Sequence, residues 1–531
     1  MAPSCVISLI LNAHLPFVRD YQKNGENSFL SVEEDWFFEA MSETYLPLCG
    51  VFERLEAARI PFSLGISLSP LLCQMMQDEF LLKKFIVYTD KQIEFGLQEQ
   101  KRNKAVPELY NLAKMYCDQA VDRKIIFTER YERNLLKVFD YFQRKGRIEI
   151  LGSAATNAFL PFFRNYPETI QAQIEVALTA YRSYFNTPVQ GFWLPELGWS
   201  PELAAYLRLY NLNYTIVDTH GFIFGKPAPM RGSFYPVRTP SGIVVFCRDY
   251  FAGTDIDNIS KESCRDNSRD AGYELLSEEL SPFINLNGIR LRTGYKYWAH
   301  ASGNTQDAVY NPALASASAV GQARVFLEAR YARLSQASEY MEETPVCLCA
   351  YNADAFGRFW YEGPAFLEAL FRLSAEYSGI HFLTPSEYLG RQSFSRMEIS
   401  VPDFSSSGFN GYAETWLDSS NDWLYRHLMR AQDRMLELTQ RFPDDSGLNE
   451  RVLNQAAREL LLAQASDWPK LLYKQESTGY ARTQIEDALR NFTTIYESLG
   501  SSYISTEWLT KLERRHNVFP GINYRVFQKK H

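Results

Sequence analysis

The sequence predicts an α/β fold: an incomplete, TIM-like (β/α)7 barrel with insertions at the barrel mouth, followed by an all-α domain at the C-terminus. Over about the first 400 residues, short apolar runs of strand length alternate with helical patterns, an order that indicates a parallel sheet with crossover helices. Seven such runs favour a closed or nearly closed barrel. After about Pro402 only helical patterns remain, and 531 residues exceed what one compact core usually holds.

The first predicted strand is the apolar run Cys5–Leu11, which ends at a polar cluster beginning with Asn12. A helical pattern follows over residues 32–58, and the same order of strand, loop and helix then recurs. The remaining predicted strands cover residues 60–66, 147–151, 189–193, 214–218, 346–350 and 380–383. Their nearly continuous apolar character is typical of strands that are buried on both faces.

Two stretches interrupt this alternation, and we interpret them as insertions beside the barrel mouth, near residues 75–124 and 231–307. The barrel domain is therefore assigned to residues 1–400 and the helical domain to residues 401–531. In the helical domain, amphipathic patterns cover residues 421–441, 448–465 and 480–499. We expect this domain to contribute to the cleft at the barrel mouth.

Composition excludes several classes of partner. The 55 Lys and Arg residues are outnumbered by 63 Asp and Glu residues, and no dense basic block occurs, so a nucleic-acid partner is not expected. No apolar run approaches the length of about 18 residues that a membrane span needs, and the N-terminal run lacks a basic region and a cleavage site. We therefore predict a cytoplasmic protein without a membrane partner; its oligomeric state is left open.

The eight cysteines are scattered through the chain. They have neither the dense spacing of a disulfide scaffold nor the paired spacing of a zinc site. Reduced thiols are therefore expected. No metal and no organic cofactor is predicted, because no cluster of His, Cys and carboxylate residues has the spacing of a metal site.

Polar residues follow the predicted strands at the points where the strands end. In a parallel barrel these ends share one face, on which active sites are built. The clusters are Asn12 and His14, residues 153–157, Glu196, Asp218 and His220, Asn352 and Asp354, and residues 386–387.

Glu196 has a setting that is typical of sugar binding. It follows Trp193 and Pro195 and precedes Trp199 at the end of a predicted strand. Sugar rings pack their apolar C–H faces on aromatic rings, while their hydroxyls and developing positive charge need carboxylates nearby. The alternative is a glutamate that is paired for structural reasons at a strand end.

Several segments resemble motifs of one known family. Residues 12–19, 146–161, 193–196, 351–364 and 384–389 are similar to its barrel motifs, and residues 415–417, 421–423 and 462–469 to segments of its helical domain. The family is glycoside hydrolase family 57, and within it the branch that contains 1,4-α-glucan branching enzymes. The resemblance runs over nearly the whole chain and implies an α-1,4-glucan substrate such as amylose or a glycogen-like oligosaccharide.

The resemblance assigns the catalytic positions. It implies that Glu196 is the nucleophile of a retaining enzyme, but Asn352 stands where the family has the aspartate that acts as general acid/base. An amide cannot donate a proton at a useful pKa. Asp354 is a possible substitute, because its side chain would point to the same side as that of Asn352 if the chain were extended there.

The resemblance also implies a set of substrate contacts. Two of them are further replacements, because Asn12 and Asn157 stand where the family usually has histidines. The tryptophans of the helical domain could equally be core between the domains, and a G-Y-P-G-D stretch expected after Asp249 is not recognisable. The predicted contacts are Asn12, His14, Asn157, Trp193, His220, Arg248, Asp249, Trp416, Trp423, Gln464 and Asp467.

Three functions remain open. The chain could be an active branching enzyme or 4-α-glucanotransferase that uses Asp354 as its acid. It could be a structural homologue that no longer binds glucan. We favour a pseudoenzyme that has kept glucan contacts and lost turnover, because three replacements by asparagine fall at one predicted mouth.

Overall fold

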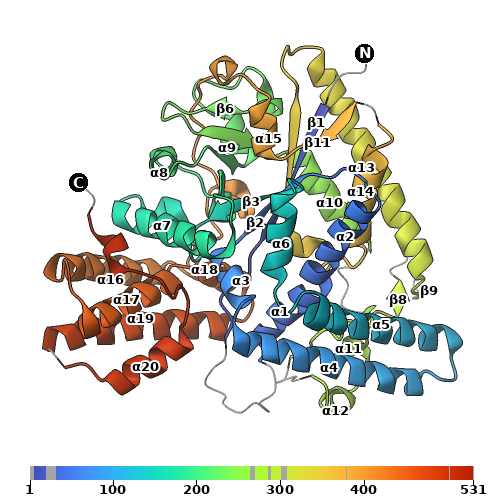
Figure 1. Ribbon diagram of the computed structural model, residues 1–531, viewed down its shortest axis with the longest axis horizontal. Coiled ribbons are helices and arrows are strands. Elements are labelled where there is room, and N and C mark those ends of the chain that lie inside the picture. The colour runs from blue at the N-terminus through green and yellow to red at the C-terminus, as the bar shows by residue number, and fades with distance from the viewer. Residues whose placement is uncertain are drawn as a thin grey trace.

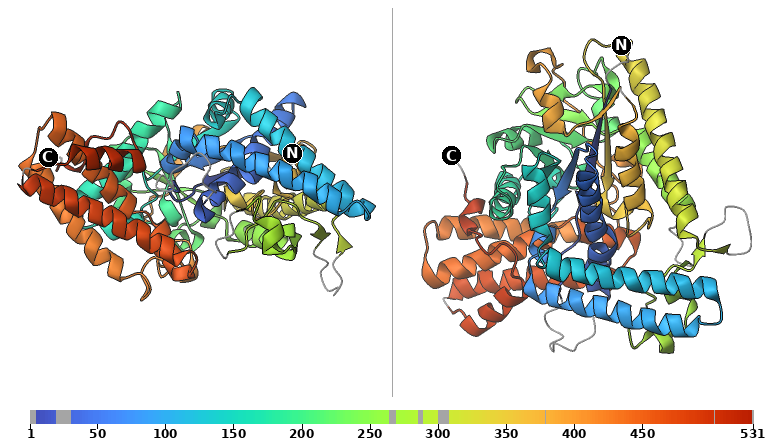
Figure 2. Two further views of the ribbon diagram at one scale, coloured as in Figure 1. Left: turned by 90° about the horizontal axis from the view of Figure 1, so that it is seen from below. Right: turned by 45° about the vertical axis from the view of Figure 1, so that its right-hand side comes forward.

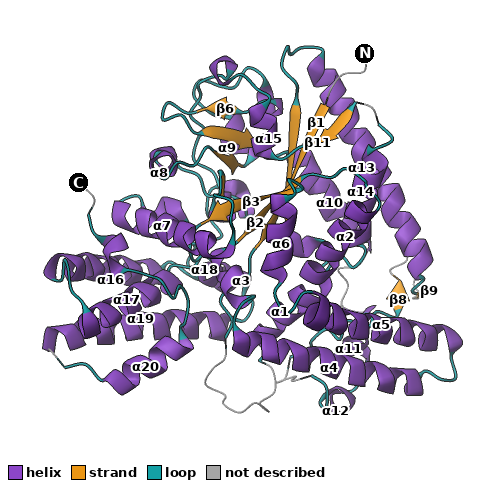
Figure 3. Cartoon of the chain, viewed as in Figure 1, coloured by secondary structure: helices purple, strands orange, loops and turns teal. Residues whose placement is uncertain are grey.

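The computed structural model describes residues 5–19, 31–263, 269–284, 289–299, 308–377, 379–501 and 503–529. Its centre is a parallel sheet surrounded by helices (Figures 1 and 3). The strand order is β10-β1-β2-β3-β4-β5-β7, and a single bridge between Arg248 and Leu348 connects the end of β7 back to β10. Seven parallel strands therefore close around the core through one weak seam, which confirms the incomplete (β/α)7 barrel.

Apart from β7, which was not predicted, the strands listed next lie close to their predicted positions. Their bounds are β1 Cys5–Ala13, β2 Leu64–Leu68, β3 Ile148–Ser153, β4 Gly191–Trp193, β5 Tyr214–Val217, β7 Val244–Cys247, β10 Val346–Asn352 and β11 Ile380–Phe382. β6 (Val237–Arg238) pairs antiparallel with β7, and β11 pairs with the start of β1 beside the barrel. β2 begins later than predicted, at Leu64, which excludes Pro61, a residue that cannot donate a ladder hydrogen bond.

One prediction for the second insertion was wrong. Residues 231–307 were assigned to an excursion, but β7 lies within them and is a full barrel strand that pairs in parallel with β5. Its four residues are buried on both faces, as in the other strands. The run Ile243–Cys247 has the apolar character of a strand, but it follows a stretch rich in Pro and Gly, and the one α-helix between β5 and β7, α9, has only five residues.

Helices cover the outside of the barrel. They are α1 Val32–Ala40, α2 Leu46–Ala57, α3 Pro70–Met75, α6 Leu135–Arg144, α7 Pro167–Tyr184, α8 Leu203–Leu209, α9 Thr219–Ile223, α10 Tyr250–Ser263, α13 Pro312–Ser338, α14 Gly363–Ser374 and α15 Pro385–Gly390. α1 begins at a capping box in which Ser31 and Glu34 satisfy each other's backbone N–H groups. It runs through a π-helical turn, Met41–Tyr45, into α2, so residues 32–57 form a continuous helical segment.

The first insertion is a helical hairpin. α4 (Glu79–Arg102) and α5 (Pro107–Ile125) lie side by side across one end of the molecule (Figure 2). They share a hydrophobic cluster with the second insertion, in which Phe95 and Tyr116 pack with Tyr295. That insertion carries α11 (Ala271–Glu274), α12 (Ser277–Leu280) and the short hairpin of β8 (Trp298–Ala299) and β9 (Ala308–Val309). The two insertions therefore pack against each other through this cluster.

The C-terminal part is helical, as predicted. Its helices are α16 Trp423–Arg441, α17 Gly447–Ala463, α18 Asp467–Lys474, α19 Thr478–Ser501 and α20 Thr506–Arg515. They pack beside α7 and α3 of the barrel (Figure 1). One hydrophobic cluster runs from barrel residues such as Leu11 to Leu460 and Phe492 of the helical part. Among the described residues, no helix combines the length and hydrophobicity needed to cross a membrane.

Candidate active site

A cleft of about 620 Å³ lies at the carboxyl ends of the barrel strands, within the range of small-molecule sites. We call it the central cleft. The barrel contributes the segments after β1, β4 and β10, α1 adds one wall, and α18 of the helical part adds another. Its lining includes Asn12, His14, Asp35, Trp36, Glu39, Glu196, Tyr273, Asn352, Asp354, Arg358, Phe359, Asp467 and Lys470.

Glu196 lies in the central cleft in a strained conformation. Its backbone has φ 56° and ψ 22°, the left-handed region that a residue with a side chain adopts at a cost of about 1–3 kcal/mol. Such strain often occurs at functional sites. Lys470 Nζ donates to both carboxylate oxygens at 3.0 Å, and the backbone N–H of Ser407 donates to the Glu196 carbonyl at 2.7 Å. A loop and a helix distant in sequence therefore hold this glutamate.

Asn352 faces another asparagine. It ends β10, where it is in register with Asn12 of β1, and Asn12 Nδ2 donates to Asn352 Oδ1 at 3.3 Å. The Asn352 side chain is exposed to the cleft. Neither amide can carry a proton to a leaving group. Two neighbouring strands therefore end in neutral groups on this side of the cleft.

Asp354 is held by other side chains. Residues Ala353–Ala355 form a 3-10 turn, so the extended chain on which its predicted alignment with Asn352 depended is absent. Tyr45 Oη donates to Oδ1 at 3.3 Å, and Arg358 Nη1 lies 3.2 Å from Oδ2. Burial raises the pKa of Asp354, although the Arg358 guanidinium acts against this. The carboxylate thus belongs to an ion pair.

Three acids on one face of the segment from α1 to α2 were missed by the sequence reasoning. Asp35, Glu39 and Glu43 are spaced four apart, which places them on one helical face. Glu39 Oε2 is 2.6 Å from Arg358 Nε, and Glu43 Oε1 is 3.0 Å from Lys296 Nζ. The four-residue spacing is a signal in the sequence, but the basic partners of Glu39 and Glu43 lie more than 250 positions away.

Asp35 differs from the other two acids. Its side chain makes no hydrogen bond or ion pair within the part of the chain that the structure describes, although it is 8% exposed and lines the central cleft. Burial, followed by the negative charge of Glu39, raises its pKa well above the usual value, and Arg358 only partly offsets this. Asp35 therefore retains its proton to higher pH than an ordinary aspartate.

Polar contacts join α18 to the barrel. His14 Nε2 is 3.0 Å from both carboxylate oxygens of Asp467, and His14 Nδ1 is 2.8 Å from Ser69 Oγ. Asn157 is buried and donates to Ser466 Oγ at 3.1 Å, while its carbonyl accepts from the Ser466 N–H. His14 and Asp467 line the central cleft, whereas Asn157 lies behind it and holds the start of α18.

The predicted tryptophan contacts lie outside the lining of the central cleft. Trp193 and Trp416 are buried, and Trp416 stacks on Phe159 with ring centroids 5.2 Å apart. Trp423 is half-buried at the start of α16, with the Arg482 guanidinium 5.3 Å above its ring. No Nε1 of these three has a hydrogen-bond partner among the described residues. Trp193 belongs to a hydrophobic cluster of barrel residues, whereas Trp416 packs between the barrel and the helical part.

Three further predicted contacts are engaged elsewhere in the fold. Gln464 is buried and accepts a hydrogen bond from Gln173 at 2.9 Å. His220 Nε2 is 2.8 Å from the carbonyl of Gly411. Arg248 Nη2 is 3.2 Å from a carboxylate oxygen of Asp218, at the ends of β7 and β5. None of the three predicted residues lines the central cleft.

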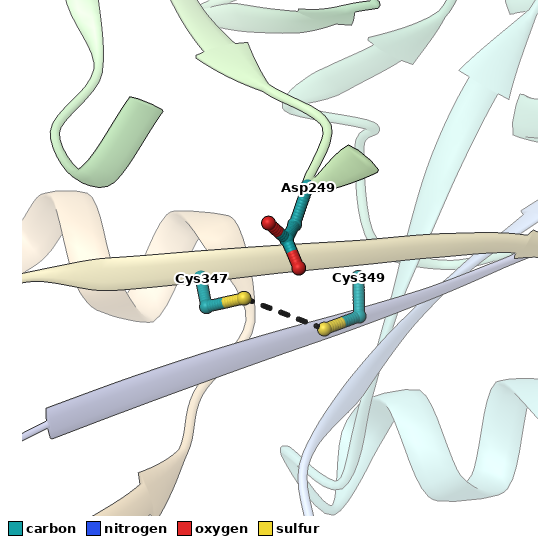
Figure 4. Close-up of side chains that lie close together, drawn as sticks. All are labelled: Asp249, Cys347 and Cys349. Atoms are coloured by element: carbon teal, nitrogen blue, oxygen red, sulfur yellow. Dashed lines mark hydrogen bonds between the residues drawn. The ribbon is translucent and has the colours of Figure 1, made fainter. Parts of the chain in front are cut away.

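Asp249, Cys347 and Cys349 form the one group of potential metal ligands within the described ranges (Figure 4). The two sulfurs are 3.7 Å apart. Arg333 Nη1 already contacts both Asp249 oxygens, at 2.9 and 3.0 Å, and the contact with Cys349 together with burial raises the pKa of Cys347 well above its usual value. A cation would compete with the Arg333 guanidinium for Asp249 and would have to displace the proton of the Cys347 thiol, so this group does not suit a metal.

Comparisons with known proteins identify the family. Residues 8–262 match the profile of glycosyl hydrolase family 57, and residues 427–527 match that of the C-terminal part of 1,4-α-glucan branching enzymes. A 1,4-α-glucan branching enzyme from Thermococcus kodakarensis is 26% identical, across 97% of this chain and 77% of that protein.

Solved structures agree with this match over the full length. The α-amylase AmyC from Thermotoga maritima is 32% identical, with a TM-score of 0.91, and the match covers 99% of this chain and 100% of that one. A branching enzyme of the family from Pyrococcus horikoshii is 25% identical, with a TM-score of 0.87, over 99% and 97% of the two chains. The chain belongs to glycoside hydrolase family 57 and is similar to its branching enzymes.

Proposed function

We propose that this protein binds α-1,4-glucan chains in the central cleft and that its turnover is strongly impaired. Branching-enzyme relatives supply the substrate class, and the motif around Glu196 supplies the position of a nucleophile. The single observation that carries the impairment is the side chain at position 352, an amide that faces a second amide at 3.3 Å. Without a proton donor, the leaving oxygen departs unprotonated, and the loss of general acid/base catalysis is worth about 10²–10⁴-fold in rate.

The cleft keeps features that suit sugar binding. Trp36, Tyr273 and Phe359 line it, and aromatic rings of this kind can pack against the apolar faces of glucose units. His14 and Asp467 offer polar atoms for hydroxyl groups from the opposite wall. Binding needs only these contacts, whereas retaining transfer also needs two carboxyl groups about 5–5.5 Å apart.

The alternative is an active branching enzyme or 4-α-glucanotransferase that uses Asp354 as its acid. Burial favours a proton on Asp354, which is the property an acid needs. Against it, the Arg358 guanidinium favours the ionised form, and the turn after Asn352 breaks the alignment between positions 352 and 354. We therefore rank this alternative second.

The test combines binding with product analysis. Calorimetric titration with maltoheptaose measures binding, and the iodine complex and chain-length distribution of amylose measure rearrangement. Glu196→Gln is the matched control, because it removes the proposed nucleophile with little change in shape. We expect both proteins to bind the oligosaccharide and to leave amylose unchanged. Rearrangement of amylose by the wild type at the rate of an active branching enzyme, abolished by Glu196→Gln, would refute the impairment.

A further inference from the structure

Lys470 is a residue of the central cleft that the sequence reasoning did not single out. Its Nζ lies 3.0 Å from both carboxylate oxygens of Glu196, which is 274 positions away in the chain. The Lys470 side chain is 32% exposed and that of Glu196 is 11% exposed. Burial alone would lower the pKa of Lys470, but the Glu196 carboxylate outweighs it and the pKa is raised. The lysine is therefore a cation at neutral pH.

The barrel itself fixes the position of this ammonium group. Asp467 and Lys470 are three residues apart in α18 and therefore share a helical face. His14 holds Asp467, and Asn157 holds Ser466 just before the helix. Asn157 is one of the positions where the family usually has a histidine, so one of the replaced positions also holds the helix that carries Lys470.

The contact of Lys470 with both carboxylate oxygens of Glu196 affects how well this glutamate can act as a nucleophile. To attack an anomeric carbon, one Glu196 oxygen must present a free lone pair, and the carboxylate must stabilise the positive charge that develops on the sugar. An ammonium group that donates to both oxygens occupies one lone pair on each and draws electron density from the carboxylate, which makes it a weaker nucleophile. It also adds a positive charge beside the site where positive charge develops, which disfavours the transition state relative to the bound ground state.

We propose that Lys470 is a positioning residue that restrains Glu196 and forms a second block on turnover, separate from the missing acid. The inference rests on the proposed function, because it takes the central cleft as the glucan site and Glu196 as the nucleophile. The two blocks act on different steps: Asn352 fails to protonate a leaving group, whereas Lys470 hinders the attack itself.

A substrate with a fluoride leaving group separates the two blocks. When Glu196 attacks α-maltotriosyl fluoride, a bond forms between a carboxylate oxygen and C1, the C1–F bond breaks, and fluoride leaves with the electron pair. No proton is needed, so Asn352 has no part in this step. Fluoride release in a single turnover and the mass of the intact protein with its attached maltotriosyl group report on the attack alone.

The variants are Lys470→Met and Lys470→Gln, which remove the charge, and Lys470→Arg, which keeps it. Glu196→Gln removes the nucleophile. Lys511→Met is the control for losing a Lys–Glu pair, because Lys511 Nζ lies 2.7 Å from Glu507 on an exposed face of α20. Calorimetric titration with maltotriose shows for every variant whether the cleft is intact.

We expect Lys470→Met and Lys470→Gln to release fluoride at least about tenfold faster than the wild type and to accumulate the adduct. Lys470→Arg and Lys511→Met should match the wild type, and Glu196→Gln should release none. If both neutral variants bind maltotriose and react no faster than the wild type, Lys470 does not restrain Glu196. If the wild type fails to bind maltotriose at all, the proposed function fails, and the inference with it.

Discussion

Removing Arg358 is expected to lower the unfolding free energy more than removing the charge of Asp354, one of the two acids with which it pairs. Its guanidinium lies 2.6 Å from Glu39 and 3.2 Å from Asp354, and all three side chains are at most 12% exposed. Arg358→Met leaves two buried carboxylates without this partner, and breaking a buried pair in this way costs about 3–5 kcal/mol. Because Arg292 still lies 3.4 Å from Glu39, we expect the lower end of that range.

Asp354→Asn is the matched change at the other end of the pair. Arg358 keeps Glu39, and the asparagine can still accept from Tyr45, so only one charge-assisted hydrogen bond is lost, worth about 1.5–3 kcal/mol. The raised pKa of Asp354 indicates that its burial already costs stability, which places the expected loss near the lower value. Urea denaturation at pH 7 should therefore show a larger loss of unfolding free energy for Arg358→Met. An equal or larger loss for Asp354→Asn would refute this reasoning.

The pH dependence of the stability of Arg358→Met follows from the pKa of Glu39. Burial raises the pKa of Glu39, but Arg358 and Arg292 outweigh it and hold the pKa below its usual value. A lowered folded pKa adds stability above the unfolded value of about 4.3, and this stability is lost as the pH falls through the folded pKa. Without Arg358, Glu39 and Asp354 can take up protons, so the deficit of Arg358→Met should shrink between pH 7 and pH 4.

Three further outcomes are expected. Asp35 has a raised pKa in the folded state, so its own contribution to stability falls as the pH rises above the unfolded value of about 3.9. Asp35→Asn should therefore melt above the wild type at pH 8 and with it near pH 3.5. Trp416→Ala should lower the unfolding free energy by about 3–5 kcal/mol, and Trp416→Phe by clearly less, because phenylalanine keeps a ring in the buried stack. Burial raises the pKa of Cys49, Cys73 and Cys247, so a thiol reagent at pH 8 should label them only after unfolding; rapid labelling of the native protein would contradict their burial.

The barrel could be predicted because its strands carry a local signal. β1 and β10 are buried on both faces, so their apolar residues run nearly without interruption and stand out from the helical patterns. β7 did not stand out in this way, because it follows a stretch rich in Pro and Gly and the one α-helix between β5 and β7, α9, has only five residues. The closing bridge between Arg248 and Leu348 joins residues 100 positions apart, and no local pattern encodes it.

The candidate site could be predicted only in part from the sequence. Motif spacing located Glu196 and Asn352, but the register that sets Asn352 opposite Asn12 follows from strand pairing across 340 positions. The contact between Lys470 and Glu196 has no sequence signal, since it depends on how α18 packs against the barrel. Trp416 shows the opposite problem, because its motif suggested a sugar contact while its stacking on Phe159 gives it a place in the core.

The most direct test of the missing acid is the rate at which Asn352→Asp rearranges amylose. Asn12→Asp is the matched control, because it places a carboxylate on the neighbouring strand within the same cleft. We predict at least about tenfold more turnover than the wild type for Asn352→Asp, rising toward about 10²–10⁴-fold when Lys470→Met is added, and no gain for Asn12→Asp. A wild type that already rearranges amylose as fast as Asn352→Asp would contradict the account.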